Sequence, residues 1–200
     1  RRPWLALGGG VALLTLLALP FLGVRYGFPD AGNDRANTTT RQAYDMLADG
    51  FGPGANGPLL LVSTDDGAAL AQVRDRVAGT PGVAAVTPPQ AAPGGGAAMM
   101  TVVPTSSPQS ADTERLVGTL RDEVAGTGIH VGGVTAAAVD TNEDMASRLP
   151  LLIGGVVGLS FLLLLTVFRS LAVAIKAAVL NLLSLAAAYG VVALVLQGVW

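Results

Sequence analysis

Cysteine is absent from this chain of 200 residues, and histidine occurs once, at His130. Without Cys there is no disulfide framework and no thiolate metal site, and a single histidine cannot form a histidine cluster. Charged residues are also scarce, at 13% of the chain, and the net charge is −2. Nucleic-acid binding calls for clustered Lys and Arg, so nothing in the composition suggests this class of function.

Charge is almost missing from three long apolar stretches. Residues 4–24 and 149–168 contain no charged side chain, and residues 171–200 contain only Lys176. An α-helix rises about 1.5 Å per residue, so about twenty residues span the roughly 30 Å of a bilayer's hydrocarbon core. The first stretch is longer than the roughly 7–15 apolar residues of a signal peptide and lacks a small-residue cleavage site. The sequence therefore predicts three transmembrane helices, of which the last two form a hairpin.

The basic residues beside these helices predict an orientation. Four lie on one side and two on the other: Arg1, Arg2, Arg169 and Lys176 against Arg25 and Arg148. The positive-inside rule places the amino terminus and the 169–176 turn in the cytoplasm. Residues 25–148 are then extracytoplasmic, and we expect a multi-pass protein of the inner (plasma) membrane. Because the chain begins without Met and stops inside an apolar stretch, we expect a fragment of a longer membrane protein.

Helical spacing of apolar residues predicts three amphipathic helices within residues 25–148. Asp65 or Asp66 can cap the second helix, and the third begins at Ser110. A last segment, residues 135–148, is also predicted to be helical and leads directly to the second membrane helix. The three apolar stripes are Tyr44, Leu47 and Phe51; Leu70, Val73 and Val77; and Leu116, Val117, Leu120 and Val124.

Short apolar runs bounded by turn residues predict four strands. They cover residues 58–64, 83–87, 98–103 and 129–132, and the Pro/Gly-rich segment 88–96 is predicted to be a loop. The order is therefore β-α-β-β-α-β, the ferredoxin-like arrangement, in which two helices cover one face of a four-stranded sheet. The predicted fold class is membrane α-helical plus α+β, with a ferredoxin-like core over residues 58–133 of an extracytoplasmic domain.

Two features of this domain have a structural interpretation that we favour over a functional one. The glycine-rich segment 52–57 precedes a strand, and no Gly-Lys-Ser/Thr follows it. A helix stop and turn is therefore favoured over a phosphate site. His130 lies on a short predicted strand without a second histidine, so we favour a structural or half-exposed residue over a metal ligand.

An acidic segment precedes the second membrane helix. Asp140, Glu143 and Asp144 resemble an acidic metal cluster on one helix. Arg148 lies four residues after Asp144, a spacing at which helical side chains of opposite charge pair. We therefore expect an ion pair on a solvated face and no metal site.

Small and polar residues inside the predicted membrane helices are the candidate packing positions. Gly154-x-x-x-Gly158 permits close approach of a neighbouring helix. Asn181, Ser184 and Tyr189 mark a polar region of the third membrane helix. Polar groups in hydrocarbon need partners, so this region is expected to meet other helices. Helix packing is the favoured interpretation, and a substrate or ion path is the alternative.

Several longer motifs resemble a known family. They are residues 41–60 (RQAYDMLADGFGPGANGPLL), 130–135 (HVGGVT), 148–151 (RLPL), 167–171 (VFRSL), 176–184 (KAAVLNLLS) and 188–190 (AYG). The chain resembles, over essentially its whole length, the MMPL transporters of actinobacteria, a branch of the resistance–nodulation–division superfamily. That family has two repeats, each with a membrane helix, a periplasmic porter domain and five more helices. The resemblance is to the start of the second repeat: the seventh helix, the second porter domain, and the eighth and ninth helices.

The resemblance implies a secondary transporter that exports lipids, glycolipids or hydrophobic drugs and is driven by protons. It implies a hydrophobic or lipid substrate, protons as coupling ion and membrane lipids as partners, and no enzyme activity, cofactor or nucleic acid. It is compatible with a homo-oligomer but does not specify the oligomeric state. A permease subunit of an ATP-driven transporter and an extracytoplasmic ligand-sensing receptor are the alternatives.

The family's proton relay consists of Asp-Tyr pairs on its fourth and tenth helices, and no position of this chain matches them. Tyr189 follows Ala188, where the pair would need Asp. The three predicted membrane helices contain no Asp, Glu or His. The resemblance therefore implies that the residues coupling transport to protons lie outside this chain.

Overall fold

The computed structural model describes residues 3–23, 29–65 and 67–197. Predictions that rest on Arg1, Arg2, Arg25, Asp66 and residues 198–200 lie outside the described residues. The chain divides into two compact units. We call Gly27–Met145 the sheet unit, and Arg1–Tyr26 together with Ala146–Trp200 the helical unit.

The sheet unit follows the element order that the sequence predicts, with one addition. The predicted loop 88–96 contains a two-residue strand. The Thr87 N–H donates to the Thr101 carbonyl at 2.9 Å, and the backbone after Thr87 continues to pair with the strand that contains Thr101. The elements are β1 (Leu59–Ser63), α3 (Ala68–Ala78), β2 (Val83–Val86), β3 (Gln90–Ala91), β4 (Ala98–Pro104), α4 (Ala111–Glu123) and β5 (Ile129–Gly132).

The five strands form one sheet in the order β2-β4-β1-β5, with β3 also paired to β4. Every pairing is antiparallel. The central strand β1 therefore fixes the positions of two strands that come much later in the chain. Leu61 of β1 lies opposite Met100 of β4 on one side and Val131 of β5 on the other.

Both helices α3 and α4 cover the same face of this sheet. Successive strand residues point to opposite faces, and one set of alternate residues, including Leu59, Leu61, Met100 and Val102, is completely buried. These side chains form one cluster with the apolar stripes of the helices, Leu70, Val73 and Val77 of α3 and Leu116, Val117 and Leu120 of α4. The other face has no helix in this cluster and carries the alternate set of strand residues.

The start of α3 depends on Asp65, although Gly67 is the residue in the cap position. Gly67 has φ +96°, a conformation that side-chain-bearing residues rarely adopt. The Asp65 carboxylate accepts hydrogen bonds from the Ser63 hydroxyl at 2.6 Å and from the backbone N–H groups of Gly67 at 2.9 Å and Ala69 at 3.2 Å. The hydrogen bond from Ser63 and, to a smaller extent, those from the two backbone N–H groups lower the pKa of Asp65 below its ordinary value.

The last predicted helix of this region is the first part of α5 (Val134–Phe168). Thr135 is buried, and its hydroxyl donates to the Gly57 carbonyl at 3.0 Å. Asp140 accepts two hydrogen bonds from Arg121 of α4, at 2.6 and 2.9 Å. This carboxylate raises the pKa of Arg121 further. The ion pair between Asp140 and Arg121 thus joins α5 to α4. Residue spacing along a single helix does not predict this pair, because its two members lie on different helices.

Helix α2 (Thr39–Phe51) begins where the Thr38 hydroxyl accepts a hydrogen bond from the Arg41 N–H. None of its residues is buried, and Leu47 and Phe51 of its apolar stripe are 44% and 75% exposed. The glycine-rich segment that follows contains the short 3₁₀ helix η3 (Pro53–Asn56). A Cβ at Gly54 would lie 1.8 Å from the Pro104 carbonyl oxygen, so this glycine permits close contact with β4.

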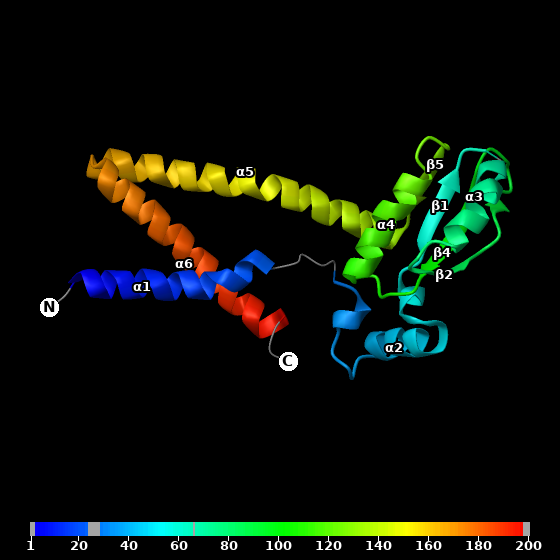
Figure 1. Cartoon of the computed structure of the whole chain (residues 1–200), viewed down its shortest axis with the longest axis horizontal. Coiled ribbons are helices and arrows are strands. Elements are labelled where there is room, and N and C mark those ends of the chain that lie inside the picture. The colour runs from blue at the N-terminus through cyan, green and yellow to red at the C-terminus, as the bar shows by residue number, and fades with distance from the viewer. Residues whose placement is uncertain (1–2, 24–28, 66, 198–200) are drawn as a thin grey trace. The chain divides into compact units, whose positions relative to one another are not determined.

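The helical unit contains α1 (Pro3–Ala18), the 3₁₀ helix η1 (Leu19–Gly23), residues 146–168 of α5, and α6 (Leu171–Gln197). Among the described residues, α5 and α6 are long and apolar enough to cross a membrane, and a shorter apolar helix covers Gly8–Phe21. Figure 1 shows α5 and α6 as two long helices joined by a tight turn. Arg169 in this turn has φ +48°.

Helices α1 and α6 cross at Gly190. A Cβ on this residue would lie 1.9 Å from the Leu17 carbonyl oxygen. Ala187 and Ala193, one turn away on either side, are also buried. At the residue before Gly190, the Tyr189 ring lies against Phe21 of η1, with 6.0 Å between ring centroids. Small residues let membrane helices approach closely, and this crossing depends on Gly190.

We predict that Asp65→Asn weakens the start of α3 at neutral pH but not in acid. Because the folded pKa is lowered, the stabilisation is present above the unfolded value of about 3.9 and is lost as pH falls through the folded value. Hydrogen exchange of the Gly67 and Ala69 amides should be faster in the variant at pH 6, and the difference should shrink below about pH 3.9. Asp75→Asn, later on α3, is the control. A difference that does not change with pH would contradict this prediction.

We also predict that Gly190→Ala destabilises the α1–α6 crossing by about 1–3 kcal/mol, the usual cost of overpacking. Gly158→Ala is the matched control, because a Cβ at Gly158 meets nothing within 4 Å. Thermal melts of the chain in detergent, followed by circular dichroism, should show a lower Tm for Gly190→Ala only. Equal melting temperatures for the two variants would refute the role of Gly190.

Candidate functional site

A row of four exposed side chains crosses the face of the sheet that α3 and α4 leave open. Met99 of β4 lies opposite Val62 of β1, which in turn lies opposite His130 of β5. On the other side, Gln90 of β3 lies opposite Met99. Directly opposite residues of antiparallel strands point to the same face. The row therefore has two apolar residues in its middle and a hydrogen-bonding side chain at each end.

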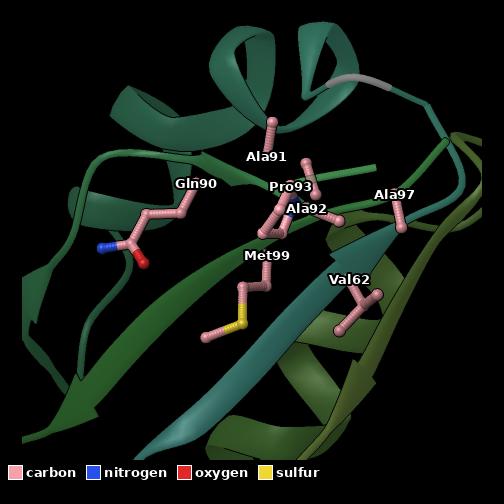
Figure 2. A pocket seen from close by; sticks show the side chains of 8 residues that line it. Val62, Gln90, Ala91, Ala92, Pro93, Ala97 and Met99 are labelled. Atoms are coloured by element: carbon pink, nitrogen blue, oxygen red, sulfur yellow. The ribbon is translucent and has the colours of Figure 1, made fainter. Parts of the chain in front are cut away.

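A groove of about 490 Å³ opens beside the apolar part of this row. Figure 2 shows Val62 and Met99 on neighbouring strands, with the segment that carries Ala91, Ala92 and Pro93 next to Met99. No charged side chain lines the groove, and Gln90 supplies its one side-chain amide. The lining residues are Val62, Gln90, Ala91, Ala92, Pro93, Ala97, Ala98 and Met99.

One wall of the groove is a tight hairpin between β3 and β4. The Ala92 N–H donates to the Ala97 carbonyl at 2.8 Å, and the Gly95 N–H donates to the Ala92 carbonyl at 2.9 Å. Gly95 and Gly96 have φ of +71° and +74°, which the turn requires and which glycine adopts without strain. Small side chains along this wall leave the groove open.

Sequence reasoning missed this groove because it treated segment 88–96 as a loop. The available signal was the run 98–103, where alternation places Met99 and Val103 on the face opposite the core. An apolar outward side of a strand indicates that this face meets something other than water. His130, expected to be structural or half-exposed, is exposed at the end of the row.

The chemistry of the groove is that of a binding surface. Its lining contains no nucleophile and no ionisable side chain. Within the described parts of the chain, no group of three His, Cys, Asp or Glu residues could hold a metal ion. An uncharged concave surface binds apolar groups, and it has no residue that performs acid–base chemistry.

The packing positions predicted in the helical unit do not come together. A Cβ at Gly154 or Gly158 would meet nothing within 4 Å, and Asn181 and Ser184 are exposed. Tyr189 alone has an observed ring contact, with Phe21 of η1. The close helix crossing instead uses Gly190, which belongs to the quoted motif 188–190 but carried no packing prediction.

A second groove of about 500 Å³ runs along α5 in the helical unit. Pro150 lies in its wall and has no N–H, so the Ala146 carbonyl, also in the wall, lacks its helical donor. Gly154 lines the groove one turn further along. The remaining lining residues are Phe21, Leu149, Ile153, Val157 and Leu182.

Comparison with known proteins places this architecture in a family. The profile of the MMPL family matches residues 39–200. Membrane protein YdfJ of Bacillus subtilis (strain 168) is 34% identical over 94% of this chain. "Heme uptake protein MmpL11" of Mycobacterium tuberculosis (strain ATCC 25618 / H37Rv) is 32% identical over the whole chain. "Mycolic acid-containing lipids exporter MmpL11" of Mycolicibacterium smegmatis is 29% identical over the whole chain.

The chain spans only part of these relatives: 27% of the length of YdfJ and 22% of each of the two MmpL11 proteins. The family profile nevertheless covers most of the chain, from α2 to the end of the second long apolar helix. The relatives are named as membrane and transport proteins. By its family profile and by its identity to these relatives, the chain belongs to the MMPL family of membrane transporters.

Proposed function

We propose that this chain is part of an inner-membrane transporter that exports lipids or other hydrophobic molecules and is driven by the proton-motive force. The observation that carries the proposal is the uncharged groove on the open face of a sheet unit that lies, in sequence, between apolar helices. A relative is named as an exporter of mycolic acid-containing lipids. An apolar binding surface in a domain that the sequence joins directly to apolar helices suits that class of substrate.

Residues 25–148, which contain the sheet unit, are the porter domain of this transporter, with a ferredoxin-like core at 58–133. The strand order β2-β4-β1-β5, with α3 and α4 packed on one face, supports this assignment. Residues 4–24, 149–168 and 171–200 are its transmembrane helices. The amino terminus and the 169–176 turn lie in the cytoplasm, where the positive-inside rule places them.

The proposed packing positions serve contacts with the rest of the longer protein. Gly154 and Gly158 have open space around them, and Asn181 and Ser184 are exposed on α6. In hydrocarbon, exposed amide and hydroxyl groups are costly unless they meet a partner. We therefore expect helices of the remaining repeat to cover these faces.

Protons are coupled to transport by residues outside this chain. Residues 149–200 contain no Asp, Glu or His, and neither do residues 4–24. Proton relays in membrane proteins are built from such side chains. The helices described here then act as scaffold beside the proton path.

The full-length protein, reconstituted in proteoliposomes with an imposed proton gradient, tests this function. A fluorescent long-chain lipid should be moved across the membrane in the absence of ATP. An ionophore that dissipates the gradient should abolish this movement. Transport that requires ATP would favour the alternative permease subunit, and no transport at all would favour the receptor. Transport of hemin in place of lipid would support the proposed transport activity but contradict the proposed class of substrate.

A further inference from the structure

We propose that the groove beside Met99 and Val62 holds one acyl chain of the transported lipid. The inference rests on the proposed function and adds a specific binding site to it. The site consists of a floor formed by Val62 and Met99 and a wall formed by the hairpin that starts at Ala92.

The distribution of charge selects an uncharged occupant. Residues 25–148 contain eight Arg and fourteen Asp or Glu, a net charge of −6. The groove lining contains none of these charged residues. The acidic domain keeps an anionic headgroup outside the groove, whereas it does not repel the acyl chain that such a headgroup carries. The groove is therefore a place where the neutral part of an amphiphile can lie.

The shape of the site suits a small molecule better than a protein partner. A volume of about 490 Å³ falls within the range of about 300–1,000 Å³ that is usual for small-ligand sites. Stable protein interfaces instead involve about 20–30 residues on each partner, whereas 8 residues line this groove. A concave groove with alanine side chains in its wall accommodates a flexible chain of methylene groups.

The polar residues at the ends of the row give this amphiphile an orientation. Neighbouring strands lie about 4.8 Å apart, so the row from Gln90 to His130 crosses three such spacings, about 14 Å. Gln90 also lines the groove, and its amide can donate a hydrogen bond to an ester or hydroxyl oxygen. The acyl chain then lies over Met99 and Val62, while the polar group of the lipid stays near an end of the row.

Thiol protection in the full-length protein tests this site directly. The 200 residues contain no Cys, so Val62→Cys and Met99→Cys each introduce a single thiol into the segment. Maleimide labelling of this segment, measured by mass spectrometry, should be about tenfold slower with palmitate at ten times its Kd. Butyrate, which has the same headgroup and a short chain, should give little protection.

Val103→Cys is the matched control. Val103 also lies on β4 and on the open face, opposite Ala85, but it is not part of the groove. Its labelling rate should not respond to palmitate. Equal protection at Val103 and Met99 would indicate adsorption over the whole face and would overturn the site. Thiols that stay unlabelled even without palmitate would also overturn it, because another part of the protein would then fill the groove.

Transport measurements separate this inference from the proposed function. Met99→Glu places a carboxylate in the groove and should lower lipid export by about tenfold or more, because burying an unpaired charge is costly. Val103→Glu should leave export near the wild-type rate. Proton-driven export that is unaffected by Met99→Glu would refute the groove as the acyl-chain site and would leave the proposed transport function intact. Absence of proton-driven export by the unmodified protein would refute the proposed transport function. In the labelling experiment, protection of Val62→Cys by hemin and not by palmitate would overturn the acyl-chain assignment.

Discussion

The antiparallel pairing of β1 with both β4 and β5 is the contact on which the sheet unit depends. It places Leu61 between Met100 and Val131, and the completely buried residues of β1 and β4 lie on this side of the sheet. Since α3 and α4 both pack on that side, the alternate residues face outward together. The apolar row at Val62 and Met99 is a consequence of this arrangement. A shift of one residue in register would move these side chains into the core.

In both units, glycine is needed where two backbones meet. Gly54 lies against the Pro104 carbonyl in the sheet unit, and Gly190 lies against the Leu17 carbonyl in the helical unit. Any side chain at either position would collide with a backbone oxygen. By contrast, Gly154 and Gly158 have space around them. Glycine spacing in a sequence therefore indicates where a close approach is permitted, but the partner backbone determines where one occurs.

Local patterns predicted most of the regular structure. Apolar stripes at helical spacing identified α3 and α4, and Ser110, where the third helix was predicted to start, is the cap of α4. The predicted strands coincide closely with β1, β2, β4 and β5. The same reasoning failed where a distant segment decides the outcome. Asp140 pairs with Arg121 on another helix, β3 forms only because β4 is available to pair with it, and the stripe of α2 remains exposed.

The sequence by itself determined the membrane character of the chain, the order of its elements and its family resemblance. These properties depend on composition and on spacing along the chain, both of which are local. Tertiary structure alone decided which residues form the groove and which glycine lies at the helix crossing. Gln90, Met99, Val62 and His130 are scattered over more than half of residues 25–148, and only strand register brings them into one row. Register arises from backbone hydrogen bonds between segments far apart in sequence, and no local pattern encodes it.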